Sequence, residues 1–189
     1  SRPPRRDRAQ TAWQQPPVPA PTPVIACFSI FVWNSRLSYD FATRIKEAHP
    51  NSIIVFGGPH YPLAKDEQEA YLRAHPNIDF YIFREGEQAF VDLFNQLSNY
   101  QFSTKDFKSA RVKSPNCHYL FEDKLITGDL LAPLKNLDEI PSPYLTGLCD
   151  DLLEKGLTPI IQTKKGCPFK CTFCEDGHDH FSRIRRFSF

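Results

Sequence analysis

The chain has 189 residues, and its 23 lysines and arginines nearly balance its 22 aspartates and glutamates, for a formal net charge of +1. This charge neither favours nor excludes a polyanionic partner. We interpret the arginine clusters as solvated and expect no nucleic-acid partner. No apolar run approaches the roughly 20 residues of a membrane helix, so we expect no membrane partner either. The length is enough for one complete domain and part of another, and the 41% of hydrophobic residues is enough for a core. Methionine is absent, and we interpret the sequence as a fragment of a longer protein.

Strand and helix patterns alternate in the first half of the chain. Residues 1–23 combine an arginine cluster with a proline-rich stretch, which predicts a disordered, extended lead-in. The patterns that follow predict strands at 24–30, 52–56 and 78–83, and helices at 37–49, 63–74 and 87–97. Such alternation favours parallel strands joined by right-handed crossovers. The predicted fold class is therefore α/β, with an open parallel, Rossmann-like sheet.

Three loops follow the carboxyl ends of the predicted strands, at 31–34, 57–60 and 84–87. In open α/β sheets, ligands bind beyond these ends, at the point where the strand order reverses. Gly57 and Gly58 permit close backbone approach in the second loop. The chain has no P-loop, and no G-x-G-x-x-G run follows a strand, which argues against nucleotide hydrolysis and dinucleotide binding.

The second half is less regular. Residues 118–121 and 124–127 flank a short acidic turn and predict a hairpin, while the prolines at 140–143 predict an extended junction. We therefore divide the chain after the lead-in into an α/β domain at 24–129, a junction at 130–157 and the start of a second domain at 158–189.

Cys167, Cys171 and Cys174 have the spacing C-x-x-x-C-x-x-C. Thiolates hold iron–sulfur clusters, and three ligands leave one iron of a cube open, as a catalytic metal site requires. Residues 159–163 predict a buried strand that ends at this loop, which is where barrel enzymes place chemistry. Two other interpretations stay open, namely a Cys₃His zinc site with His178 or His180, and three unrelated thiols.

The other cysteines, Cys27, Cys117 and Cys149, are scattered, and we expect them to be buried or partly buried as small hydrophobic residues. Their number does not suggest a secreted disulfide framework, so we expect a reducing, cytoplasmic environment. Arg183, Arg185 and Arg186 are expected on a solvated face.

The run at 161–174 resembles the cluster loop of radical S-adenosylmethionine (SAM) enzymes. In that family three cysteines bind a [4Fe–4S] cluster, SAM chelates the fourth iron, and electron transfer cleaves SAM to methionine and a 5′-deoxyadenosyl radical. The resemblance implies that Cys167, Cys171 and Cys174 are the cluster ligands. It also implies that Phe173, the aromatic before the last cysteine, lies near the adenine of SAM.

The stretches at 26–34, 54–60 and 84–87 are similar to the cobalamin-binding domain that precedes many radical SAM barrels, and the stretch at 137–144 is similar to the junction that leads from that domain into the barrel. This resemblance implies cobalamin as a further cofactor. The residues that it suggests for cobalamin binding are Ser29, Asn34, Gly57, Gly58, His60, Glu85, Gly86 and Glu87. Because the chain has no D-x-H-x-x-G run, we expect no histidine below cobalt.

Together these resemblances imply a cobalamin-dependent radical SAM enzyme that transfers methyl groups or carries out radical rearrangements. They also imply a flavodoxin-like or ferredoxin-like electron donor, and they leave the substrate and the catalytic residues open. Because few residues follow the junction, we expect the fragment alone to be inactive. The alternatives are a non-catalytic α/β module that binds cobalamin or a metal, and a Cys₃His zinc-stabilised interaction protein.

Overall fold

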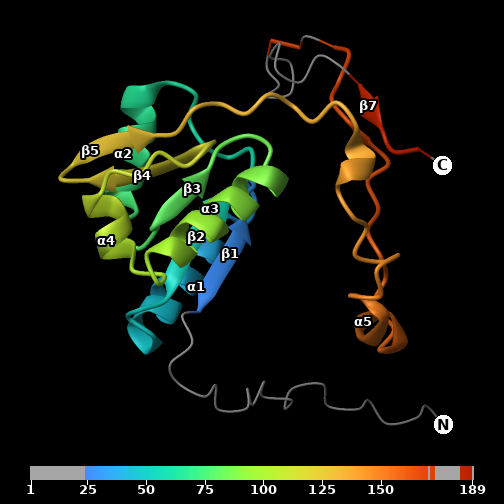
Figure 1. The fold of residues 1–189 in the computed structure, drawn as a ribbon, viewed down its shortest axis with the longest axis horizontal. Helices are drawn as coiled ribbons and strands as arrows, with labels where there is room; N and C mark the ends of the chain where they lie inside the picture. The colour runs from blue at the N-terminus through green and yellow to red at the C-terminus, as the bar shows by residue number, and fades with distance from the viewer. Residues whose placement is uncertain (1–23, 170, 173–183, 189) are drawn as a thin grey trace, which may run out of the picture.

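A five-stranded sheet forms the centre of the fold (Figure 1), and the computed structural model describes residues 24–169, 171–172 and 184–188. The strands lie in sequence order and are β1 (Ile25–Ser29), β2 (Ile53–Gly57), β3 (Phe80–Ile82), β4 (Cys117–Phe121) and β5 (Lys124–Thr127). The first three are parallel, whereas β4 and β5 each pair antiparallel with the strand before. The predicted α/β class is confirmed, and so is the hairpin.

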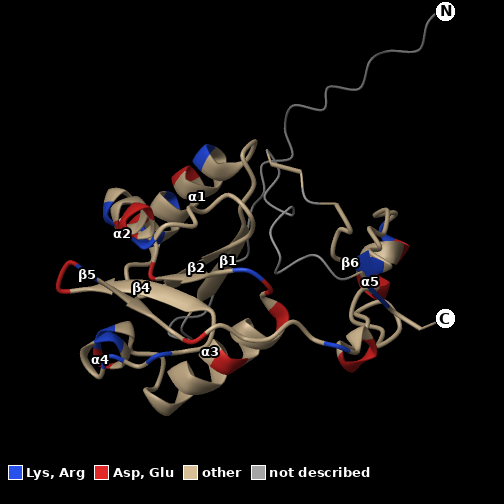
Figure 2. Ribbon diagram, turned by 90° about the horizontal axis from the view of Figure 1, so that it is seen from above, with Lys and Arg blue, Asp and Glu red and all other residues tan. Residues whose placement is uncertain are grey.

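Helices cover both faces of the sheet (Figure 2). The two that follow β1 and β2, α1 (Ser35–Ala48) and α2 (Lys65–Ala74), lie on one face. The next two, α3 (Glu87–Asn99) and α4 (Thr104–Ser109), lie on the other. The sequence patterns predicted α1, α2 and α3 to within two residues at each end but did not predict α4.

The unbroken apolar run of β2 follows from this sandwich, because a parallel strand covered on both faces needs apolar side chains on each. Ile54 and Phe56 pack with the α1–α2 side of the core, whereas Ile53 and Val55 pack with the α3–α4 side. On α3, apolar residues at four-residue spacing bury one stripe against the sheet: Ala89, Leu93 and Leu97. Truncating such a side chain, as in Leu93→Ala, costs about 2–5 kcal/mol.

The hairpin turn between β4 and β5 consists of Glu122 and Asp123, both in the left-handed backbone region with φ of 49° and 57°. Two-residue hairpins favour this conformation because its twist matches that of the strands. Cys117 is buried in β4 as expected, but Cys27 is exposed, because β1 is the edge strand of the sheet.

Residues beyond the hairpin run away from the sheet and contain a 3₁₀ turn, η1 (Leu137–Glu139), and a short helix, α5 (Asp150–Glu154) (Figure 1). The strand predicted at 159–163 is wrong. Ile160 is 88% exposed, and its backbone N–H and C=O bond to the hydroxyl of Tyr144 rather than to a neighbouring strand. The pairing there is instead between β6 (Lys164–Lys165) and β7 (Arg185–Arg186), which are antiparallel.

Within the described ranges, every helix is too short or too polar to cross a membrane.

Candidate cofactor-binding edge and cysteine loop

The loops after β1, β2 and β3 emerge at one edge of the sheet, since these strands are parallel neighbours. The expected reversal of strand order is not found among the described strands, which follow the order β1-β2-β3-β4-β5. The three loops therefore form a row along the carboxyl edge rather than flanking a crevice at a switch point.

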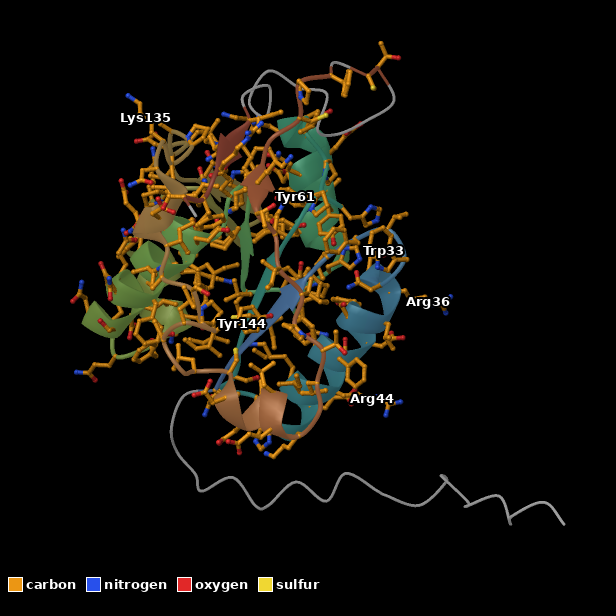
Figure 3. All side chains as sticks on the ribbon, turned by 90° about the vertical axis from the view of Figure 1, so that its right-hand side faces the viewer. Trp33, Arg36, Arg44, Tyr61, Lys135 and Tyr144 are labelled. Carbon is orange, nitrogen blue, oxygen red and sulfur yellow. The ribbon has the colours of Figure 1, made fainter. Side chains whose placement is uncertain are left out.

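The loop after β1 is held by the side chain of Asn34. Its Oδ1 accepts a hydrogen bond from the Phe31 N–H at 2.7 Å, and its Nδ2 donates to the Ser29 carbonyl at 2.8 Å. The ring of Trp33 stacks on Phe31 at 4.7 Å between centroids, yet 78% of Trp33 is exposed (Figure 3). Both polar atoms of the Asn34 amide are thus hydrogen-bonded to the main chain of the loop. The exposed side chains of Val32 and Trp33 form an apolar surface on this loop.

The loop after β2 depends on Gly58, whose φ is +121°. A Cβ at this position would lie 2.5 Å from the Ile30 carbonyl oxygen, so only glycine fits without moving the backbone. Gly57, in contrast, has only ordinary contacts around its Cβ position. His60 lies exposed at the end of this loop, and its N–H donates to the Ile30 carbonyl at 3.3 Å.

An aromatic cluster lies beneath the second loop. Tyr61 stacks on Tyr81 with ring centroids 3.8 Å apart, and the Tyr81 hydroxyl donates to the Gly58 carbonyl at 3.0 Å. The Tyr61 hydroxyl is 3.4 Å from Nδ1 of His118. Burial, with a smaller effect of the Lys65 charge, lowers the pKa of His118 to about 4. Burial also raises the pKa of both tyrosines, so the cluster is neutral near pH 7.

The loop after β3 and the first residue of α3 each carry an acid whose carboxylate binds a cation of β6 or β7. Glu85 forms an ion pair with Arg185, and Glu87 forms one with Lys165. Burial alone would raise the pKa of Glu87, but the hydrogen bond from Lys165 and its charge hold this pKa below the usual range. The main chain of the loop is anchored as well, since Asn116 Nδ2 donates to the Glu85 carbonyl at 3.2 Å.

A cavity of about 300 Å³ lies between this loop and the segment before the cysteines. Its lining is charged and polar, and consists of Arg84, Glu85, Gly86, Glu87, Gln162, Lys164, Lys165, Gly166 and Arg185. The cavity thus joins the candidate cofactor-binding edge to the start of the cysteine loop.

The cysteine loop is described in part. Cys167 is half-buried and Cys171 is exposed, and both are free thiols. The third predicted ligand, Cys174, lies outside the described residues, as do Phe173, His178 and His180. Among the residues that the structure does describe, no three His, Cys, Asp or Glu side chains converge on one point. The cluster ligands therefore stay a prediction.

Sequence reasoning missed Lys165 and Arg185, which line the cavity. The expectation of a solvated face is wrong for Arg185, whose side chain is only 11% exposed. Local sequence carried no signal for this, because Arg185 reaches an acid 100 residues earlier in the chain. The only hint was the pair of acids flanking Gly86.

Comparison with known proteins bears on both halves of the chain. In an alignment of 172 residues that covers 87% of the chain, the chain is 32% identical to the cobalamin-dependent radical SAM methyltransferase TokK of Streptomyces tokunonensis. Over an equal share it is 30% identical to the 2-(S-pantetheinyl)-carbapenam-3-carboxylate methyltransferase of Streptantibioticus cattleyicolor. An uncharacterized methyltransferase of Pyrococcus horikoshii is 30% identical over 78% of the chain.

The chain spans 24% of the length of the first two relatives and 30% of the third. No family model matches it. The chain is therefore similar, along most of its length, to part of a cobalamin-dependent radical SAM methyltransferase and to part of two further methyltransferases.

Proposed function

We propose that this chain is the portion of a cobalamin-dependent radical SAM methyltransferase that contains the cobalamin-binding domain and the cluster loop. The observation that carries the proposal is the similarity, over 87% of the chain, to one such methyltransferase and to a second methyltransferase. The α/β fold and the spacing of Cys167, Cys171 and Cys174 support it independently. Of the two outcomes that the sequence left open, we favour methyl transfer over rearrangement, since the relatives are methyltransferases.

The carboxyl edge of the sheet fits a large, flat, partly apolar group. Val32 and Trp33 are neighbours in the first loop and are 69% and 78% exposed, so together they offer an apolar surface on which such a group could rest. The neighbouring Gly58 loop is rigidly seated on Ile30. We propose that these two loops hold cobalamin, which when bound would serve as the carrier of the methyl group.

The cysteine loop fits an iron–sulfur cluster through the chemistry of its donors, since two of the three thiols are free. We propose that Cys167, Cys171 and Cys174 hold a [4Fe–4S] cluster and that Phe173 contacts the adenine of SAM. A flavodoxin-like or ferredoxin-like protein would supply the electron. An oxygen-sensitive cluster of this kind favours a reducing, cytoplasmic location.

Metal analysis after anaerobic purification tests the proposal. We expect iron and sulfide in equal amounts, near four of each per chain, after reconstitution. Each of Cys167→Ala, Cys171→Ala and Cys174→Ala should remove most of the iron, whereas Cys27→Ala, at the exposed edge strand, should not. One zinc per chain in place of iron would overturn the cluster assignment and favour the Cys₃His alternative.

Cobalamin binding is measured separately, from the absorbance of the protein after gel filtration with hydroxocobalamin. We expect about one cobalamin per chain. A protein that binds iron but no cobalamin would contradict the assignment of the carboxyl edge and leave the cluster loop unaffected.

A further inference from the structure

Two acids at the junction of β3 and α3, Glu85 and Glu87, contact a matched pair of cations. Lys165 of β6 and Arg185 of β7 are register partners in the antiparallel pair, so their side chains stand next to each other. Two like charges in such positions destabilise a strand pair. Here each cation has its own acid, because Glu87 binds Lys165 and Glu85 binds Arg185.

Burial distinguishes these ion pairs from ordinary surface pairs. The exposed side-chain fractions are 11% for Arg185, 16% for each of Glu85 and Lys165, and 37% for Glu87, so the Glu85–Arg185 pair is the more shielded of the two. The Arg185 guanidinium also donates to the Leu134 carbonyl at 2.9 Å, which adds the junction segment to the same contact. Removing one member of a shielded pair leaves its partner charged and unmatched, which costs far more than breaking an exposed pair.

The ion pairs lie between the two candidate cofactor sites. Glu85 lies in the loop at the carboxyl end of β3 and Glu87 is the first residue of α3, whereas Lys165 lies two residues before Cys167. The side chains of the segment before Lys165 are little packed, since Ile160 and Ile161 are 88% and 68% exposed, and Ile160 bonds through its backbone to the Tyr144 hydroxyl. The ion pairs thus attach the beginning of the cysteine loop to the sheet.

We propose that Glu85 and Glu87 are positioning residues, which clamp β6 and β7 onto the α/β domain and so set where the cysteine loop lies relative to the carboxyl edge. We name the four residues Glu85, Glu87, Lys165 and Arg185 the acid–base clamp. Its role in catalysis rests on the proposed function, because it would fix the separation of cobalamin and cluster. The clamp itself requires neither cofactor.

Hydrogen exchange on the cofactor-free, full chain tests the clamp. Glu85→Gln and Glu87→Gln should each accelerate deuterium uptake of peptides covering 162–167 and 184–187 by at least about tenfold, since Arg185 or Lys165 then loses its negatively charged partner. Peptides of β2 should be unchanged. Glu122→Gln is the matched control, because it breaks the exposed pair with Arg111 and should leave both segments at the wild-type rate.

A charge exchange separates the clamp from a general structural effect. Glu87→Lys alone should loosen both segments, and combination with Lys165→Glu should restore most of the protection. If Glu85→Gln does not fold, Arg185→Ala removes the same pair from the other strand. Wild-type exchange rates in the single variants, or no restoration in the exchanged pair, would overturn the proposal.

A spectroscopic measurement connects the clamp to the cofactors. With cobalt(II) cobalamin and a reduced cluster both bound, the two paramagnetic centres interact through a dipolar coupling that depends on their separation. In Glu85→Gln we expect this coupling to weaken, or its distribution to broaden. Faster exchange in a protein that binds no cobalamin would uphold the clamp and reject the proposed function. Unchanged exchange in a protein that binds both cofactors would reject the clamp and uphold the proposed function.

Discussion

The Cβ position of Gly58 lies 2.5 Å from the carbonyl oxygen of Ile30 and 2.8 Å from its backbone nitrogen. This contact seats the loop after β2 directly on the end of β1. The two loops that we propose as the cobalamin surface are therefore one packed unit. Its geometry depends on the absence of a single side-chain atom.

Gly58→Ala should destabilise the fold for two reasons. Alanine rarely adopts a φ of +121°, and its Cβ would clash with Ile30 unless the backbone shifts. We expect a loss of about 2–3 kcal/mol in the free energy of unfolding, measured with urea. Gly57→Ala is the control, because its Cβ would meet Ile82 at ordinary distances of 3.5 and 3.6 Å. Equal losses in the two variants would show that the contact with Ile30 is not the cause.

The amino-terminal side of the sheet contains a shielded charge cluster around Asp79. Its Oδ2 lies 2.7 Å from Lys46 Nζ and accepts a hydrogen bond from the Ile54 N–H at 2.8 Å. Its other oxygen, Oδ1, lies 3.8 Å from Lys108 Nζ. Asp79→Asn retains an acceptor but leaves both lysines without the charge. We expect it to lower the free energy of unfolding by about 3 kcal/mol.

The comparison for Asp79 is Glu122→Gln, which breaks the exposed pair with Arg111 and should change the unfolding free energy by less than about 1 kcal/mol. If Asp79→Asn were equally mild, the cluster would contribute no more than a surface ion pair. Its shielding would then be without energetic consequence.

The pH dependence of stability should reflect His118, because burial holds its pKa near 4 in the folded chain. The unfolded chain, with a histidine pKa of about 6.5, binds this proton first as the pH falls. The contribution to stability is therefore complete above about pH 6.5 and is lost between there and pH 4, amounting to ~3 kcal/mol. His118→Asn should lose less stability over this range in urea titrations, and an unchanged slope would contradict the assignment.

Trp33 should contribute to cobalamin binding without contributing much to stability, since most of its surface is exposed. Trp33→Ala should weaken the affinity by about tenfold or more, as burial of a large aromatic is lost on binding. Val91→Ala, at a half-exposed site on α3, should bind as the wild type does. Equal affinity in all three proteins would exclude the β1–α1 loop from the binding surface.

Much of the fold could be predicted from local patterns. Strand and helix positions from β1 to α3 follow from apolar periodicity, because each element must bury a face whose spacing depends only on its own geometry. The β4–β5 hairpin follows from the same kind of pattern. The spacing of Cys167, Cys171 and Cys174 is likewise a local feature, which is why the sequence alone indicates a cluster.

Only the tertiary structure decided which residues meet across the chain. The apolar stretch before the cysteines has the composition of a buried strand, but a strand forms only where a neighbour supplies a hydrogen-bonding ladder, and Ile160 instead bonds to Tyr144. Arg185 has the sequence context of a surface charge and is buried against Glu85, 100 residues away. Periodicity reports on one element at a time, whereas ion pairs and strand partners depend on how separate elements pack.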